Sequence, residues 1–128
     1  MILIPPKQTN RFRIEFLSHG TPIKELAIHA LTVDPIRYNP SLQQHPVTVV
    51  FEDDIYNQVL KCLSVLWMET VDINLEIMDG DDNPMIRWLF GDGKMTSMTH
   101  GPFDYSLSAA ILLQSEFICR TAKLVHLR

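Results

Sequence analysis

The residues of this sequence that could bind a metal ion are concentrated in one short acidic run, Asp79-Gly80-Asp81-Asp82-Asn83. Side-chain oxygens at alternate positions are how an EF-hand loop begins, and oxygen ligands are what Ca²⁺ prefers. That loop also needs glycine at its sixth position and glutamate at its twelfth, where this chain has Pro84 and Phe90. Asp, Gly and Asn are the residues that a tight turn requires, so we interpret the run as the solvated tip of a β-hairpin.

The other patterns typical of catalysis or cofactor binding are incomplete. Gly91-Asp92-Gly93 lacks the third glycine and the βαβ context of a dinucleotide fingerprint, and no P-loop motif occurs. There is no GxSxG elbow, and neither Cys62 nor Cys119 carries a catalytic or zinc-binding signature. The histidines stand singly, without metal-binding spacing, at His19, His29, His45, His100 and His126. We expect no enzyme activity, catalytic residue, cofactor or metal site, although residues distant in sequence can assemble a site through the fold.

The composition indicates one folded domain, residues 1–128. The chain is 46% hydrophobic and 20% charged, which is ordinary for a globular protein of this size. Lys and Arg number 11 against 15 Asp and Glu, and the net charge of −4 does not favour general binding of DNA or anionic membranes. Met1–Pro6 lacks a basic region and is too short for a signal peptide or a membrane span, so we expect synthesis in the cytoplasm. Both cysteines are predicted to be buried thiols.

Two strands are predicted near the N-terminus. Apolar and charged residues alternate over Arg11–Leu17, which is the pattern of a half-buried strand. Ser18–Pro22 has the composition of a turn, and a second alternation runs over Glu25–Thr32. We expect these two strands to pair as a hairpin.

Three prolines, Pro35, Pro40 and Pro46, dominate the next segment. They predict that Asp34–Pro46 is an exposed, extended connection, through which neither a helix nor a central strand runs. The β-branched segment Val47–Phe51 then predicts another strand.

One helix is predicted, over Asp54–Leu66. Asp53 or Asp54 can cap it by accepting hydrogen bonds from its free N–H groups. Apolar residues at steps of three and four form one stripe, which must cover a sheet or core face: Ile55, Val59, Cys62, Leu63 and Leu66.

A second hairpin follows the helix. Alternation over Asp72–Met78, the acidic turn and a return through Met85–Phe90 together predict it, with Pro84 restricted to an edge or turn role. Trp88 shares a face with its apolar neighbours in the return strand, and Trp67 closes the helix stripe. Each tryptophan is interpreted as a core residue or, alternatively, as the anchor of a subunit interface.

The remaining segments are expected to be mainly β. Gly91–Gly93 predicts a further turn before the weakly patterned Lys94–His100, and Gly101–Ser106 predicts a loop. A final strand is predicted over about Ser115–Leu127, while Ala109–Glu116 is alternatively a helical turn or two.

This succession of elements resembles the tail-tube protein family of contractile-tailed phages, whose fold also occurs in the Hcp tube of type VI secretion. The corresponding segments are Arg11–Phe16, Val47–Phe51 leading into Asp54–Trp67, Val71–Gly80, the Gly101–Ser106 loop and the β-rich C-terminus.

The resemblance implies a mainly β fold with one α-helix, in which a small antiparallel β-barrel or sandwich is flanked by the helix. It implies a structural virion protein: a tail-tube subunit that closes into hexameric rings, which stack around a channel for DNA. Sheath, baseplate and tape-measure proteins are the implied partners, no membrane is involved, and assembly takes place in the host cytoplasm. A baseplate or neck adaptor, or an Hcp-like tube component of type VI secretion, is the alternative.

Ring formation would also give partners to unpaired strand edges, and a modest negative charge suits a channel that must not hold DNA. The candidate subunit-interface residues are apolar side chains in the N-terminal tail, the proline-rich connection and the Gly101 loop. They are Ile2, Leu3, Ile4, Ile36, Tyr38, Phe103 and Tyr105. Packing within the same subunit is the alternative for each.

Overall fold

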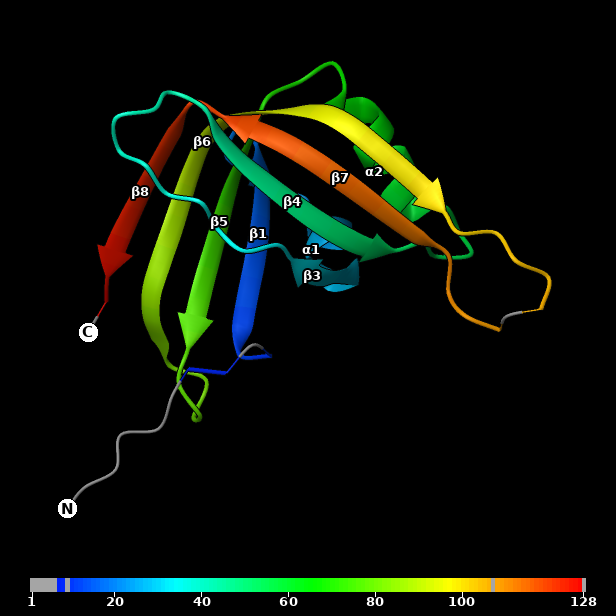
Figure 1. Ribbon diagram of the computed structural model, residues 1–128, viewed down its shortest axis with the longest axis horizontal. Helices are drawn as coiled ribbons and strands as arrows, with labels where there is room; N and C mark the ends of the chain where they lie inside the picture. Colours follow the sequence, from blue (N-terminus) through cyan, green and yellow to red (C-terminus); the bar gives the residue numbers. More distant parts are fainter. Residues whose placement is uncertain (1–6, 9, 107, 128) are drawn as a thin grey trace.

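In the computed structural model, two antiparallel β-sheets pack face to face and share one long strand, with two short helices behind them in Figure 1. The structure describes residues 7–8, 10–106 and 108–127. Sheet A has the order β8-β6-β5-β1-β2, and sheet B the order β6-β7-β4-β3. The strands are β1 (Phe12–Ser18), β2 (Thr21–Pro22), β3 (Ala30–Val33), β4 (His45–Glu52), β5 (Val71–Met78), β6 (Pro84–Gly101), β7 (Leu112–Cys119) and β8 (Thr121–His126), and the helices are α1 (Lys24–His29) and α2 (Gln58–Leu66). The expected mainly β, antiparallel fold is confirmed: of the barrel and the sandwich it is the sandwich, which is not closed, and it has two helices instead of one.

The hairpin predicted around the acidic turn is confirmed as β5 and the first half of β6. Leu75 of β5 lies opposite Trp88 of β6 on one side and Ile14 of β1 on the other. Because partners in neighbouring strands share a face, this row and the neighbouring Phe16–Ile73 row point into the core. The predicted strand Arg11–Leu17 is β1, displaced by one residue.

β6 runs without interruption through Gly91–Gly93, so the turn predicted there is wrong. Asp92 has a φ of 50°, and the register with β5 shifts between Val71 and Ile73, which together bend the strand. A Cβ added to Gly93 would lie 2.8 Å from the Val71 carbonyl oxygen and 2.9 Å from the Cys119 sulfur. Glycine lets the backbones approach here. Beyond the bend, β6 no longer pairs with β5 and pairs with β7 instead.

The final predicted strand has a corner at Arg120. β7 pairs with the second half of β6, and β8 pairs with the first half. At the corner the Arg120 N–H donates to the Gly91 carbonyl (3.0 Å), directly opposite the bend in β6. β7 already begins at Leu112, so the helical alternative for Ala109–Glu116 is wrong. β7 and β8 together therefore pair along both halves of the bent strand β6.

The segment predicted as a second strand, Glu25–Thr32, forms α1 followed by the short β3. The expected hairpin with β1 is therefore wrong: β1 pairs with the two-residue β2, and β3 pairs with β4. Leu26 is fully buried, whereas Ile28 is 73% exposed, so the two do not share a face as alternation required. Ile23 and Leu26 pack on the same core. They are three residues apart, which is the spacing of side chains on one face of a helix.

Residues 34–44 form the extended connection that the prolines predicted. It is not only a solvated link, because Ile36 packs against the core and Tyr38 lies edge-on to Trp88, with ring centroids 5.2 Å apart. In Figure 1 this segment crosses in front of sheet A towards β8.

Pro46 lies within β4, a central strand of sheet B, where the sequence predicted that no such strand would run. The Thr48 carbonyl accepts from the Asp34 N–H (2.9 Å), so even-numbered backbone groups of β4 face the β3 side. The pairing of β3 with β4 ends at Val49. Proline is tolerated because its missing N–H would face a side on which β3 no longer pairs.

α2 begins at Gln58, later than the predicted Asp54. Asp54 nevertheless caps it: one carboxylate oxygen accepts from the Val59 N–H (3.0 Å), and the other from Gln58 (3.1 Å) and Tyr56 (3.2 Å). These bonds, that of Val59 above all, lower the pKa of Asp54 below its ordinary value. In the predicted stripe Val59, Leu63 and Leu66 are buried, Cys62 is half-buried, and Ile55 precedes the helix and is 88% exposed.

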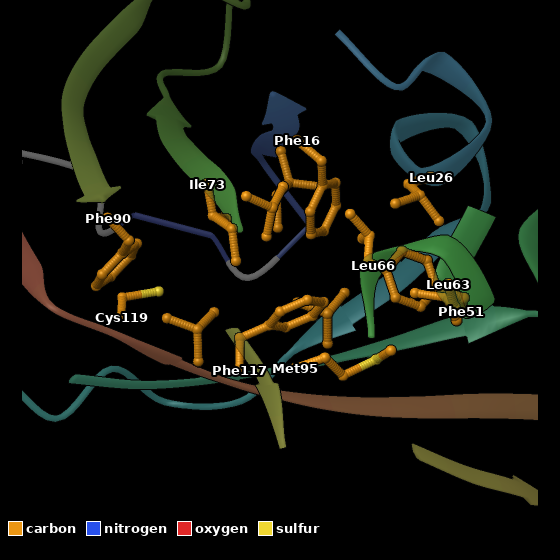
Figure 2. Close-up of a cluster of buried hydrophobic side chains, with 14 of the residues drawn as sticks. Phe16, Leu26, Phe51, Leu63, Leu66, Ile73, Phe90, Met95, Phe117 and Cys119 are labelled. Atoms are coloured by element: carbon orange, nitrogen blue, oxygen red, sulfur yellow. The ribbon is translucent and has the colours of Figure 1, made fainter. Parts of the chain in front are cut away.

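The core lies between the sheets and continues under α2. Phe16 of sheet A meets Phe51 and Phe117 of sheet B, with ring centroids 5.5 and 6.0 Å apart. Figure 2 shows these rings together with Leu63 and Leu66 of α2. The helix therefore covers a core face, as its apolar stripe predicted, and it closes one end of the sandwich.

The bend in β6 gives a direct test of the fold. We expect Gly93→Ala to lower the free energy of unfolding by about 1–3 kcal/mol, because its methyl group would overlap backbone and sulfur atoms. Gly80→Ala, at the hairpin tip with nothing within 4 Å, is the matched control and should change stability by less than about 0.5 kcal/mol. Urea unfolding followed by circular dichroism measures both. Equal stabilities would show that β6 does not need the close approach at residue 93.

Candidate functional site

The described side chains do not form a cluster with metal-binding geometry. Among residues 7–8, 10–106 and 108–127, no three His, Cys, Asp or Glu side chains gather closely enough to hold a metal ion. The closest approach of an acid and a histidine is Asp53 Oδ2 to His100 Nε2, at 2.9 Å. The Phe103 ring lies edge-on to His100 at 5.2 Å, so this pair anchors the start of the loop that follows β6. Asp53 is engaged here and does not cap α2.

Neither cysteine is poised as a nucleophile. Burial raises the pKa of the Cys119 thiol to about 12, and it raises the pKa of Cys62 as well. A thiol with a raised pKa has little reactive thiolate at neutral pH. Cys119 is buried as predicted, whereas Cys62 is only half-buried. No helix in the described part of the chain is long and apolar enough to cross a membrane.

The features with a clear capacity for interaction are the outer edges of sheet A. β8 is one edge. Leu127, the residue that follows β8, donates its N–H to the Met85 carbonyl (2.9 Å), in register with the pairing of β8 and β6. By alternation, the backbone groups of Ala122, Leu124 and His126 face away from β6. No strand in the described part of the chain pairs with that side.

β1 is the opposite edge of sheet A. The Met78 N–H donates to the Arg11 carbonyl (2.9 Å), so the backbone groups of Phe12 and Ile14 face away from β5. Among the described residues, β2 and the start of α1 cover only the C-terminal end of β1. Beside the uncovered part the sandwich is open, and a hollow of ≈ 790 Å³ separates β1 from β3. Its apolar lining includes Phe12, Val33, Ile36, Leu75 and Ile77.

The strand directions of sheet A allow the sheet to continue from copy to copy. Four of its strands run the length of the sheet, β8, β6, β5 and β1, and each pairs antiparallel with the next. With an even number of alternating strands, β8 and β1 run in opposite directions. If one copy follows another side by side, β8 of the first is therefore antiparallel to β1 of the second, and the hydrogen-bonding pattern continues.

The predicted interface residues fall into three groups. Ile2, Leu3 and Ile4 lie outside the described residues. Ile36 and Tyr38 pack within the subunit, although Tyr38 keeps 45% of its surface exposed. Phe103 and Tyr105 are 68% and 112% exposed, on the loop that projects at the right of Figure 1.

The two tryptophans separate as well. Trp88 is half-buried and stacks on Phe90 at 6.0 Å, which is the core interpretation. Trp67 ends α2 and is 39% exposed. Sequence reasoning missed further exposed apolar residues, and the only signal for two of them, Tyr56 and Val65, was a position inside the predicted helix but off its apolar stripe. The others are Leu42, in the predicted connection, and Met68, just after the predicted helix.

Comparison with known proteins gives a fold. No protein-family profile matches the sequence, and no curated protein is detectably similar to it. Among solved structures, a chain of the PVC sheath–tube complex of an extracellular contractile injection system, in its extended state, has a TM-score of 0.72 at 14% identity, over 95% of this chain and 93% of that one. A chain of the anti-feeding prophage cap, which terminates the tube, has a TM-score of 0.74 at 12% identity, over 98% and 95%. Hcp1 from Flavobacterium johnsoniae has a TM-score of 0.57 at 10% identity, over 89% and 95%.

Further neighbours come from the anti-feeding prophage baseplate and from the PVC sheath/tube terminator. The chain thus has the fold of contractile-injection tube proteins and Hcp, as the sequence resemblance implied.

The projecting loop is held by one carboxylate whose titration can be followed. Asp104 Oδ1 accepts hydrogen bonds from the Ser106 hydroxyl (2.7 Å) and N–H (2.9 Å). Both bonds lower the pKa of Asp104, and the bond from the hydroxyl has the larger effect. We expect Ser106→Ala to raise this pKa towards the ordinary value of 3.8. The pKa of Asp104 is lower in the folded state than in the unfolded state. The contribution of Asp104 to folding stability is therefore present above the ordinary pKa and is lost as the pH falls through the folded-state pKa. Carboxyl-detected NMR titration measures the shift, and an unchanged pKa would contradict this geometry.

Proposed function

We propose that this chain is the subunit of a contractile-tail tube and that copies associate side by side into hexameric rings, which stack. The observation that supports this most directly is that each side of sheet A has an edge that the described residues leave uncovered, with directions that allow antiparallel continuation. Joining β8 of one copy to β1 of the next supplies partners for the outward backbone groups of both edges. It also turns two exposed edges, which otherwise invite uncontrolled aggregation, into an ordered contact.

The uncovered face of sheet A then lines the channel. Sheet B packs against its other face, and this bulk belongs outside a closed ring. The uncovered face carries three basic and three acidic side chains by strand register: Arg13, Arg87, Lys123, Glu15, Asp72 and Glu76. Glu76 and Arg87 form an ion pair at 3.3 Å. Opposite charges in equal number do not accumulate phosphate groups, so DNA passes without specific binding.

The partners follow from the same role. A tube in a contractile particle contacts a surrounding sheath, a baseplate at its end and a tape-measure protein, so we propose the virion tail as its location and the host cytoplasm as the place of assembly. The neighbours from a baseplate and a terminating cap support one alternative, an adaptor that docks on a single ring without forming a tube. The likeness to Hcp supports the other, a tube component of type VI secretion.

Wild-type protein at high concentration should form rings or tubes by electron microscopy, and Ala122→Pro should prevent this. Proline removes an N–H that faces away from β6 and leaves the β6–β8 bonds in place. The lost hydrogen bond and the added bulk should weaken association by at least about tenfold, which corresponds to roughly 1.4 kcal/mol. Sedimentation velocity measures the association.

Ala122→Ser keeps the N–H and is the matched control, which should assemble like the wild type. Both variants must melt within a few degrees of the wild-type monomer. A wild-type protein that stays strictly monomeric would refute the tube proposal, and an Ala122→Pro variant that assembles normally would refute the β8 junction.

A further inference from the structure

Two hollows border the free part of β1. The hollow between β1 and β3 has a volume of ≈ 790 Å³ and an apolar lining. A second hollow, of ≈ 700 Å³, lies between β1 and α1, and β1 contributes residues 12–15 to its lining. Among the described residues, the first to bond this edge is Ile23, whose N–H donates to the Phe16 carbonyl (2.8 Å). Residues 12–15 therefore form an edge with room for one more strand.

The two edges of sheet A, β8 at the left and β1 at the right in Figure 1, match in the faces of their side chains as well as in their directions. On β1 the residues with outward backbone groups are Phe12 and Ile14, and both side chains pack on the core. On β8 they are the even-numbered residues, of which Leu124 lies opposite Trp88, another residue that packs on the core. Hydrogen-bonded partners in an antiparallel pair have their side chains on the same face. Joining the two edges therefore continues the core face of one copy into the next.

Every register in which β8 bonds both Phe12 and Ile14 uses Leu124. The two free residues of β1 lie opposite either Leu124 and Ala122 or His126 and Leu124, since only these pairs keep the outward groups of both strands together. In both registers the Leu124 side chain lies beside β1 on the core face, where the hollow is. Leu124 is the one large apolar residue of this set, and in its own copy it is only half-buried.

We propose that Leu124 of one copy enters the hollow beside β1 of the next copy and completes the core of that copy. This inference rests on the proposed function, because it takes the β8–β1 junction as its premise. The occupant is a second copy, since the edge beside the hollow and the edge that carries Leu124 match in direction, in hydrogen-bonding pattern and in face. An apolar side chain that fills a preformed hollow is the kind of anchor that dominates the energy of an interface. The contact is heterologous, so every copy offers one free Leu124 and one free hollow until a ring closes.

Truncation of the entering side chain tests its contribution. Leu124→Ala should weaken ring formation by about tenfold, because it removes most of the apolar group and keeps every backbone hydrogen bond. Val125→Ala is the matched control at the next residue of the same strand. Val125 is also half-buried, but it lies opposite Arg87 on the channel face, and its variant should assemble like the wild type. Sedimentation velocity measures association, and thermal melts confirm that each monomer is folded.

Two charge variants test the heterologous geometry. Leu124→Asp alters the side chain that enters, and Leu31→Asp places a charge in the wall of the hollow, at a residue that is 44% exposed in the monomer. Neither variant should associate with itself, since every junction would bury an unpaired carboxylate in an apolar contact. An equimolar mixture should form a dimer and nothing larger. In that dimer, the Leu31→Asp copy offers an intact Leu124 to the intact hollow of the Leu124→Asp copy.

The outcomes separate this contact from the tube proposal. If the wild type forms rings but Leu124→Ala assembles normally, Leu124 does not fill the hollow and the tube proposal stands. Self-association of either charge variant, or a mixture that stays monomeric while the wild type forms rings, also refutes the contact. If the wild type forms no rings, both proposals fail together.

Discussion

The architecture depends on the close approach of three backbones where β6 bends. Gly93 of β6 lies against the Val71 carbonyl and the Cys119 sulfur, and Arg120 makes its hydrogen bond to Gly91 directly opposite. This approach lets one strand serve both sheets, with β5 and β8 on its first half and β7 on its second. The two sheets are thereby held face to face, and the aromatic cluster around Phe16 fills the space between them.

The same arrangement determines what the molecule exposes. Because β6 changes sheets, sheet A is left with β8 at one side and β1 at the other, and the part of the chain that the structure describes covers neither edge fully. The helices close only one end of the sandwich, and the hollow between β1 and β3 stays open. A domain of this size with two uncovered edges gains stability and solubility when copies pair through them. The same fold occurs in chains from the tube complex and the tube-terminating cap of contractile injection systems.

Much of the fold could be predicted from local patterns. The hairpin of β5 and β6, the strand β4 and the apolar stripe of α2 follow from alternation and helical spacing. The failures share a cause, since each depends on contacts between distant residues. Gly91–Gly93 has the composition of a turn, but in the fold Gly93 allows β6 to approach Val71 and Cys119 closely. Alternation over Glu25–Thr32 gave no sign that Ile28 would be exposed, because the tertiary packing that buries Leu26 decides which side chains of this segment face the core. Among the interface candidates, exposure of Phe103 and Tyr105 could be expected, whereas Trp88 beneath Tyr38 could not.

The central claim is that copies join through β8 and β1, with the uncovered face of sheet A towards a channel. A cryo-EM reconstruction of the assembled particle, at a resolution that separates strands, tests it most directly. The account predicts β8 of each copy beside the next copy's β1, antiparallel and hydrogen-bonded, with Arg13, Glu76 and Arg87 facing the channel. A ring in which these two edges are apart, or in which sheet B faces the channel, would contradict it.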